Sequence, residues 1–215
     1  MQTKLLVNAA GNDGIDLSAT SQYRLPKALA HSPATTNSIL LVTNLMQDGL
    51  TLYPSSNIPG TDPFLRARTL SAPGTQIQST LLMETAESAA YGAMTGTSMA
   101  APHVSGLAAV LSSNYPLLTH HRIAECFLKG ATPLLYDENH MCTYELKTFT
   151  AASLNALLEN HPEGIEISQD QFISSISFDN PSHLKVTKEW WQKSQERFGQ
   201  GRVNLQNALD YAKEM

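Results

Sequence analysis

The stretch from residue 97 to residue 116, TSMAAPHVSGLAAVLSSNYP, places the tightest constraint on the fold. Most of its residues are small, so a neighbouring element could pack close to its backbone. A helix tolerates proline only near its first turn. Pro102 therefore puts the start of this helix close to Ser98. The segment 114–116, Asn-Tyr-Pro, ends it. We therefore expect one buried helix here.

Strand patterns surround this helix. Residues 37–45, NSILLVTNL, are almost continuously apolar, as expected for a strand of a sheet that is covered on both faces. KLLV at 4–7 reads as a short buried strand that ends in the glycine-rich turn NAAGNDG at 8–14. TQIQSTL at 75–81 alternates like another strand, and SAPG at 71–74 reads as a turn.

The remaining segments are assigned from caps and amphipathic patterns. Residues 15–36 are polar and contain two prolines, which predicts a loop with one short helical turn. Thr119 can cap a helix that runs to about Lys129. Three further helices are expected within 151–160, 188–198 and 199–215.

This order of elements predicts an α/β fold with three layers and a mainly parallel sheet between helices. Residues 1–137 would form the main part of the domain. Residues 138–197 are more polar and would form a partly helical insertion. Residues 198–215 would supply the closing turn and helix.

Composition excludes several classes of protein. The chain is 42% hydrophobic and 15% charged, which is typical of a globular domain. A net charge of −5 gives no electrostatic footprint for nucleic acid or an anionic membrane. No apolar run approaches the roughly 20 residues of a membrane-spanning helix, and the start carries no signal-peptide pattern, so localisation stays open. The two cysteines, Cys126 and Cys142, are expected to be free thiols, although a disulfide is not excluded.

Two residues could carry chemistry. Ser98 at a helix start has free backbone N–H groups beside it, and Gly96 permits an unusual backbone just before it. A serine there could be a nucleophile, or it could simply cap the helix. Asn12 follows a predicted strand, where its amide could donate to a developing oxyanion or merely form the turn.

Taken together, these motifs resemble the subtilisin-like serine proteases, the subtilases. GTSMAAPHVSG at 96–106 resembles their serine motif, and LLVNAAGNDG at 5–14 resembles their strand ending in the oxyanion asparagine. Further matching segments occur in the family's order, three between these two motifs at 37–45, 53–60 and 70–74, and one after them at 199–209. The asparagine favours this branch over the related sedolisins, which use an aspartate there.

The resemblance implies a role for each matching residue. Ser98 would be the nucleophile, and Asn12 together with the Ser98 backbone N–H would hold the oxyanion. Ala10 and Gly11 would line a wall of the pocket for the substrate side chain before the cut. Met99 would border the leaving-group side. Losing such an asparagine costs about 10²–10³ in turnover, a value that comes from this family.

The family's catalytic aspartate and its His-Gly motif have no counterpart in this sequence. The histidines are His31, His103, His120, His121, His140, His161 and His183, and none precedes glycine. His103 is five residues from Ser98, which turns it about 140° away around a helix. The N-terminal part of the domain, with its Asp and His motifs, would then be missing from this chain. Otherwise the chain is a degenerate relative, or His140, His161 or His183 replaces the base.

The sequence therefore predicts the Ser-bearing portion of a serine endopeptidase, with little or no activity alone. The alternative is a non-catalytic pseudoprotease that binds extended peptides. Expected partners are a protein or peptide substrate and the missing N-terminal part, with no nucleic acid and no membrane. No metal ligands are evident, although the resemblance allows a structural calcium ion. Trp190 and Trp191 could form a docking surface or pack on the domain, and packing is favoured.

Overall fold

The computed structural model describes residues 4–81, 91–176 and 181–215. Its centre is a parallel sheet of β1 (Leu6–Ala9), β2 (Ile39–Leu45) and β3 (Thr69–Pro73), in the order β1-β2-β3. Every residue of β2 is buried. The near-continuous apolar run of β2 is the pattern of a strand covered on both faces, and the α/β fold class is confirmed.

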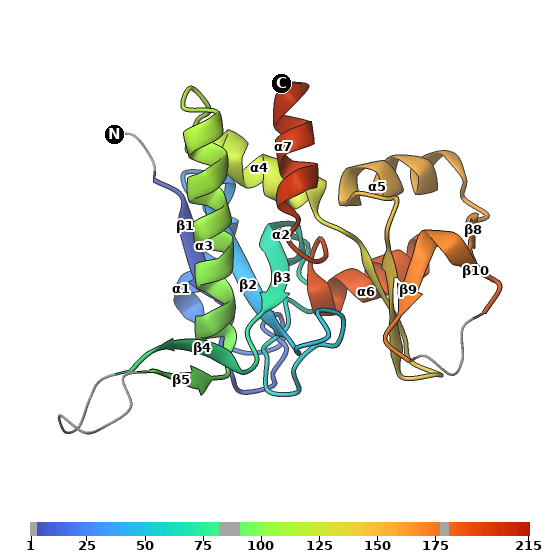
Figure 1. The fold of residues 1–215 in the computed structure, drawn as a ribbon, viewed down its shortest axis with the longest axis horizontal. Coiled ribbons are helices and arrows are strands. Elements are labelled where there is room, and N and C mark those ends of the chain that lie inside the picture. The colour runs from blue at the N-terminus through green and yellow to red at the C-terminus, as the bar shows by residue number, and fades with distance from the viewer. Residues whose placement is uncertain (1–3, 82–90, 177–180) are drawn as a thin grey trace.

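Alternate residues of β2 point to two separate parts of the core. Leu40 and Val42 join the cluster that includes α3 (Thr97–Asn114), whereas Ile39 and Leu41 join the cluster of α1 (Arg24–His31) and α2 (Pro63–Arg68). Successive side chains of a strand point to opposite faces, so helices cover both faces of the sheet. This is the expected three-layer arrangement, and Figure 1 shows α3 running alongside the strands.

The C-terminal elements enclose one end of this core. They are α4 (His120–Gly130), β6 (Leu134–Asp137), β7 (Cys142–Leu146), α5 (Ala151–Asn160), β8 (Ile165–Ser168), β9 (Phe172–Ser174), β10 (His183–Val186), α6 (Lys188–Phe198) and α7 (Leu205–Lys213). The order β6-β7-β9 forms an antiparallel sheet, and β8 pairs with β10. Figure 1 shows β8–β10, α5 and α6 gathered on the side away from α3.

The chain returns to the central sheet through residues 199–203. Ser71 N–H donates to the Gly201 carbonyl at 2.8 Å, and Val203 N–H donates to the Ser71 carbonyl at 2.9 Å. Gly201 has φ 118°, and a side chain there would collide with the Thr132 carbonyl. Only glycine therefore fits this turn. Arg202 also forms an ion pair with Glu145 of β7, which joins the two sheets.

A hairpin of β4 (Ile77–Thr80) and β5 (Tyr91–Met94) projects from the body (Figure 1). It leads directly into the start of α3 through Thr95 and Gly96. The predicted strand at 75–81 is thereby confirmed in part, because it forms β4.

Three sequence-based expectations are wrong. Residues 24–31 form a helix instead of a single turn, because Pro26 lies in its first turn, where the missing N–H does no harm. SAPG does not begin with a turn, because β3 continues to Pro73. Helix α3 is buried on one face only, since His103, Ser105, Gly106, Ala109 and Val110 are exposed.

Other expectations are confirmed. Helices α5 and α6 have the predicted bounds, and Thr119 caps α4 by accepting from Arg122 N–H. Cys126 and Cys142 are buried thiols that form no disulfide bond with each other. Trp191 is buried and Trp190 half-buried, so both pack on the domain. In the part of the chain that the structure describes, no helix is long and apolar enough to cross a membrane.

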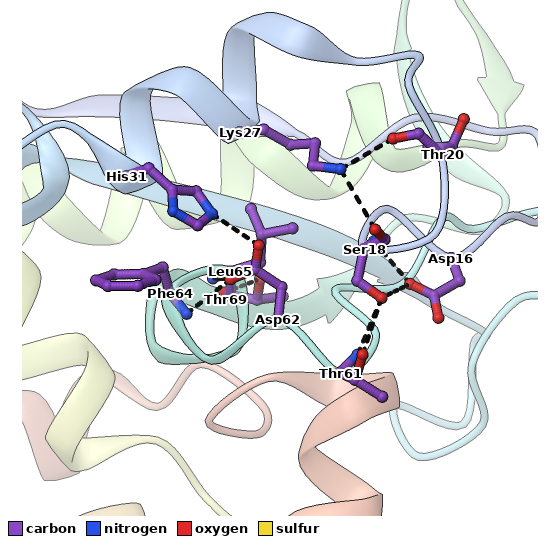
Figure 2. Close-up of polar contacts among 10 residues, drawn as sticks. All are labelled: Asp16, Ser18, Thr20, Lys27, His31, Thr61, Asp62, Phe64, Leu65 and Thr69. Carbon is purple, nitrogen blue, oxygen red and sulfur yellow. Dashed lines mark hydrogen bonds and ion pairs between the residues drawn. The ribbon is translucent and has the colours of Figure 1, made fainter.

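Polar contacts hold the segment after β1 against α1 and α2 (Figure 2). Lys27 Nζ donates to the Thr20 carbonyl at 2.9 Å, and Ser18 Oγ donates to Asp16 Oδ1 at 2.6 Å. The Asp62 carboxylate caps α2 and lies 2.7 Å from His31 Nε2 at the end of α1. These contacts fix the two helices and the loop relative to each other.

Candidate functional site

The side chain of Asn12 lies across the start of α3. Its Oδ1 accepts from Thr97 N–H at 2.8 Å and from Thr97 Oγ1 at 3.1 Å. Gly11 N–H donates back to Thr97 Oγ1 at 3.1 Å. A Cβ at Gly96 would stand 3.3 Å from the Asn12 amide, so glycine permits this close approach. The loop after β1 and the helix start are thus joined just before Ser98.

This arrangement leaves two N–H donors without acceptors. Because Asn12 Oδ1 faces Thr97, the Nδ2 of the same amide points away from Thr97. This Nδ2 has no hydrogen bond to any described residue. The Met99 and Ala100 N–H groups reach the Gly96 carbonyl, at 2.9 and 3.3 Å. Ser98 N–H has no acceptor among the described residues, as expected in a first helical turn. Two donors and the positive end of the helix dipole therefore lie beside the exposed Ser98.

A fully buried asparagine, Asn57, holds the loop that carries Asn12. Its Nδ2 donates to the Ala10 carbonyl at 3.0 Å, and its Oδ1 accepts from Asp13 N–H and Ile15 N–H at 3.0 and 3.1 Å. Gly11 has φ 104°, and a side chain there would collide with the Asn57 amide and the Tyr23 ring. The loop shape therefore depends on both Gly11 and Asn57.

Tyr23 closes the loop from outside. Its hydroxyl donates to the Asp13 carboxylate, and this hydrogen bond raises the pKa of the phenol. Tyr23 has a left-handed backbone with φ 53°, which costs a non-glycine residue about 1–2 kcal/mol. The strained backbone brings the aromatic ring onto Gly11.

The other predicted residues lie in the Asn12 loop and in α3. Ala10 is buried and Met99 is half-buried. His103 is exposed, and its Nδ1 lies 2.9 Å from the Met99 carbonyl, one turn back along α3. The Ser98 hydroxyl has no hydrogen bond to any described residue, and no described histidine contacts it.

The three histidines of the predicted insertion have partners of their own. His140 Nδ1 lies 2.8 Å from Asp137, His161 Nδ1 lies 3.4 Å from Glu163, and His183 Nδ1 lies 3.0 Å from Ser182 Oγ. Among the described residues, no three His, Cys, Asp or Glu side chains converge to hold a metal ion.

A family model, described as the subtilase family, matches residues 2–166. This chain belongs to the subtilase family. Its curated relatives include the extracellular serine protease of Serratia marcescens, 32% identical over 148 residues, which is 61% of this chain and 14% of that protein. A subtilisin of Bacillus pumilus is 46% identical over 63 residues, which is 29% of this chain and 21% of that protein. This subtilase therefore spans a minor part of these relatives' length.

Solved structures support the same fold. The patellamide maturation protease PatG aligns with 98% of this subtilase and 44% of its own chain, with a TM-score of 0.56 and 20% identity. The prenylagaramide maturation protease PagA covers 96% of this chain and 50% of its own, with a TM-score of 0.52 and 17% identity. The chain thus spans about half the length of these subtilisin-like proteases.

The sequence did not reveal two residues of the site of this subtilase. Asn57 and Thr97 make the contacts that fix the Asn12 loop, yet Asn57 lies more than forty residues away along the chain. Both occur within segments that resemble the family, 53–60 and 96–106. The resemblance of these two segments to the family was the available signal. It did not show which residues the Asn57 and Thr97 side chains contact.

Proposed function

We propose that this chain supplies the nucleophile and the oxyanion hole of a serine endopeptidase. Subtilase membership supports serine-type peptide hydrolysis in general. In the proposed reaction, Ser98 Oγ attacks the peptide carbonyl carbon and its proton passes to a base. The leaving amine takes a proton as the C–N bond breaks, and water then hydrolyses the acyl-enzyme.

The pair of free donors at the start of α3 carries this proposal. Asn12 Nδ2 and Ser98 N–H are both unpaired among the described residues, and Thr97 holds Asn12 in place. Preorganised donors without competing acceptors are what an oxyanion requires. A helix cap alone would not need a second loop fixed across the helix start.

The remaining roles, which are contacts with the substrate on either side of the cut, would fall to Ala10, Gly11 and Met99. The segment from Ala10 to Gly11 precedes Asn12 in the loop that Asn57 holds, and it would form a wall for the substrate side chain before the cut. Met99 is half-buried on the helix beside Ser98 and would border the leaving group.

The base and its aspartate would come from the N-terminal half of a subtilase catalytic domain. Strand β1 lies at an edge of the central sheet, and a groove of about 520 Å³ between β1 and α3 is lined by Leu5, Val7, Ser105, Ala108 and Ala109. An edge that has no partner among the described strands, and that lies beside small residues, fits a further parallel strand and a helix. The solved relatives continue to about twice the length of this chain.

A labelling experiment tests the proposal. A fluorophosphonate forms a phosphorus–oxygen bond to an activated serine and releases fluoride. We expect little labelling of this chain alone, and strong labelling after addition of a subtilase N-terminal half with its Asp and His, abolished by Ser98→Ala. Ala109→Arg in the groove should block the restoration, whereas the matched Ala156→Arg on the exposed face of α5 should not. Labelling of another residue in the restored enzyme would contradict the assignment of Ser98.

The second candidate is a peptide-binding module without catalysis. The observation that favours it is the Ser98 hydroxyl, which has no hydrogen bond to any described residue. If the restored protein binds peptides and never labels, this function replaces the first.

A further inference from the structure

A second cleft lies where the central sheet meets the C-terminal elements. It has a volume of about 510 Å³ and opens between the loop after β1, the segment 58–60, the β6–β7 turn and α6. Pockets of roughly 300–1,000 Å³ at such junctions commonly hold ligands. Helix α6 and the loop that carries Asp16 both contribute to its lining.

Aromatic side chains form part of the lining. Trp190 Nε1 donates to the Tyr136 carbonyl at 2.8 Å, which fixes the indole at the cleft. The Arg197 guanidinium lies 4.0 Å from the centre of the Tyr136 ring, so this cation is already engaged. Its Nε is buried and has no hydrogen-bond partner among the described residues.

The lining is predominantly acidic. Its carboxylates come from three elements: Asp16, Asp137, Glu138, Glu189 and Glu196. Its cations are Lys193 and Arg197, and Lys193 Nζ already lies 3.5 Å from Glu189. Glu138 and Glu196 form no ion pair with any described residue. Excess negative charge beside aromatic rings favours cationic groups.

The carboxylates are too dispersed for a single ion. No three of the described acidic side chains converge to hold a metal. Asp16 is held through Oδ1 by Ser18, and Figure 2 shows its other oxygen free of the residues drawn. Separate carboxylates on separate elements suit a ligand with several cationic groups spread along its length.

We propose that this cleft binds a basic peptide segment through lysine or arginine side chains. Asp16 follows Asn12 by four residues, so their Cα atoms lie within about 14 Å, the limit of an extended chain. An extended peptide of a few residues can therefore reach both the cleft and the Ser98 site. Binding here does not require a reactive Ser98, so its success or failure is separate from that of the proposed hydrolysis.

The test uses the Ser98→Ala form of the full chain, titrated with acetyl-tetralysine amide at low salt and followed by tryptophan fluorescence. We expect saturable binding that weakens as salt rises. Acetyl-tetraserine amide should not bind. The double variant Glu138→Gln/Glu196→Gln should weaken binding about tenfold. The matched pair Glu159→Gln/Glu214→Gln, outside the cleft, should bind as the parent does.

A further variant locates the signal. In Trp190→Phe, the fluorescence change should disappear because the remaining Trp191 is buried, while calorimetry still detects binding of the basic peptide. Equal affinity of the cleft and control pairs for tetralysine would overturn the proposal, as would the absence of saturable binding or equal binding of the neutral peptide.

Discussion

At the scale of the residue, the buried side-chain amide of Asn57 holds the Asn12 loop in place. Asn57 satisfies backbone groups at Ala10, Asp13 and Ile15, and its own N–H donates to the Gly11 carbonyl at 2.9 Å. The serine motif and the asparagine loop could be predicted from the sequence, because each is a local pattern. The Asn57 contacts could not, because they join segments far apart along the chain.

Replacing Asn57 with alanine should destabilise the fold by about 3 kcal/mol, because three side-chain hydrogen bonds are lost in a buried place. Urea unfolding followed by circular dichroism measures the change. Asn160→Ala, at the exposed end of α5, should stay within about 0.5 kcal/mol of the parent. Equal stabilities of the two variants would show that Asn57 does not hold the loop.

At the scale of the element, caps and periodicity predict most helices, but Pro26 wrongly indicates a break where α1 forms. Helices α5 and α6 follow clear amphipathic patterns after a threonine cap, so their bounds could be read directly. The sequence does not predict helix α1, because a proline in a polar segment indicates a break, whereas Pro26 lies in the first turn, where a helix tolerates it. The exposed face of α3 was missed because small residues suit both a buried helix and an uncovered one.

The pairing of α1 with α2 should depend on pH through Asp62. Burial alone would raise its pKa, but hydrogen bonds from His31 and from the N–H groups of Leu65 and Phe64 hold it below the ordinary 3.8. A pKa lower in the folded than in the unfolded state stabilises the fold above that ordinary value. This contribution is lost as the pH falls through the folded-state pKa.

Two substitutions separate the charge from the cap. In urea unfolding between pH 3 and 7, Asp62→Asn should flatten the acid side of the stability profile while its amide oxygen still caps α2. Asp62→Ala should lose about 1 kcal/mol more at pH 7, because the cap is gone. The control Glu159→Gln should run parallel to the parent. An Asp62→Asn profile as steep as the parent's would mean that other carboxylates set the acid limit.

At the scale of the whole molecule, one hydrophobic cluster runs from the parallel sheet into the C-terminal elements. Leu40 and Val42 of β2 belong to the same cluster as Leu146, Val186 and Trp191. The sequence predicted residues 138–197 as an insertion from their polar composition. How closely this part packs on the sheet depends on contacts that composition does not record.

Unfolding should therefore be a single cooperative transition. Both tryptophans lie in α6, so their fluorescence reports on the predicted insertion, while far-UV circular dichroism reports on all helices. We expect the two urea midpoints to coincide. A fluorescence transition at lower urea would show that the insertion melts independently of the sheet.

The return of the chain at Arg202 has a consequence for how this architecture tolerates change. Thr132 and Arg202 exchange both backbone hydrogen bonds at 2.9 Å. The chain therefore leaves the sheet and returns to it at a single hydrogen-bonded pair of residues. Cα atoms in such a pair stand about 5.5 Å apart. Everything between them is topologically a side excursion, but Leu146, Val186 and Trp191 pack in the same cluster as β2. The surface loops of this excursion could therefore be lengthened or shortened without moving β3 or α7, whereas its core-packed elements could not be replaced.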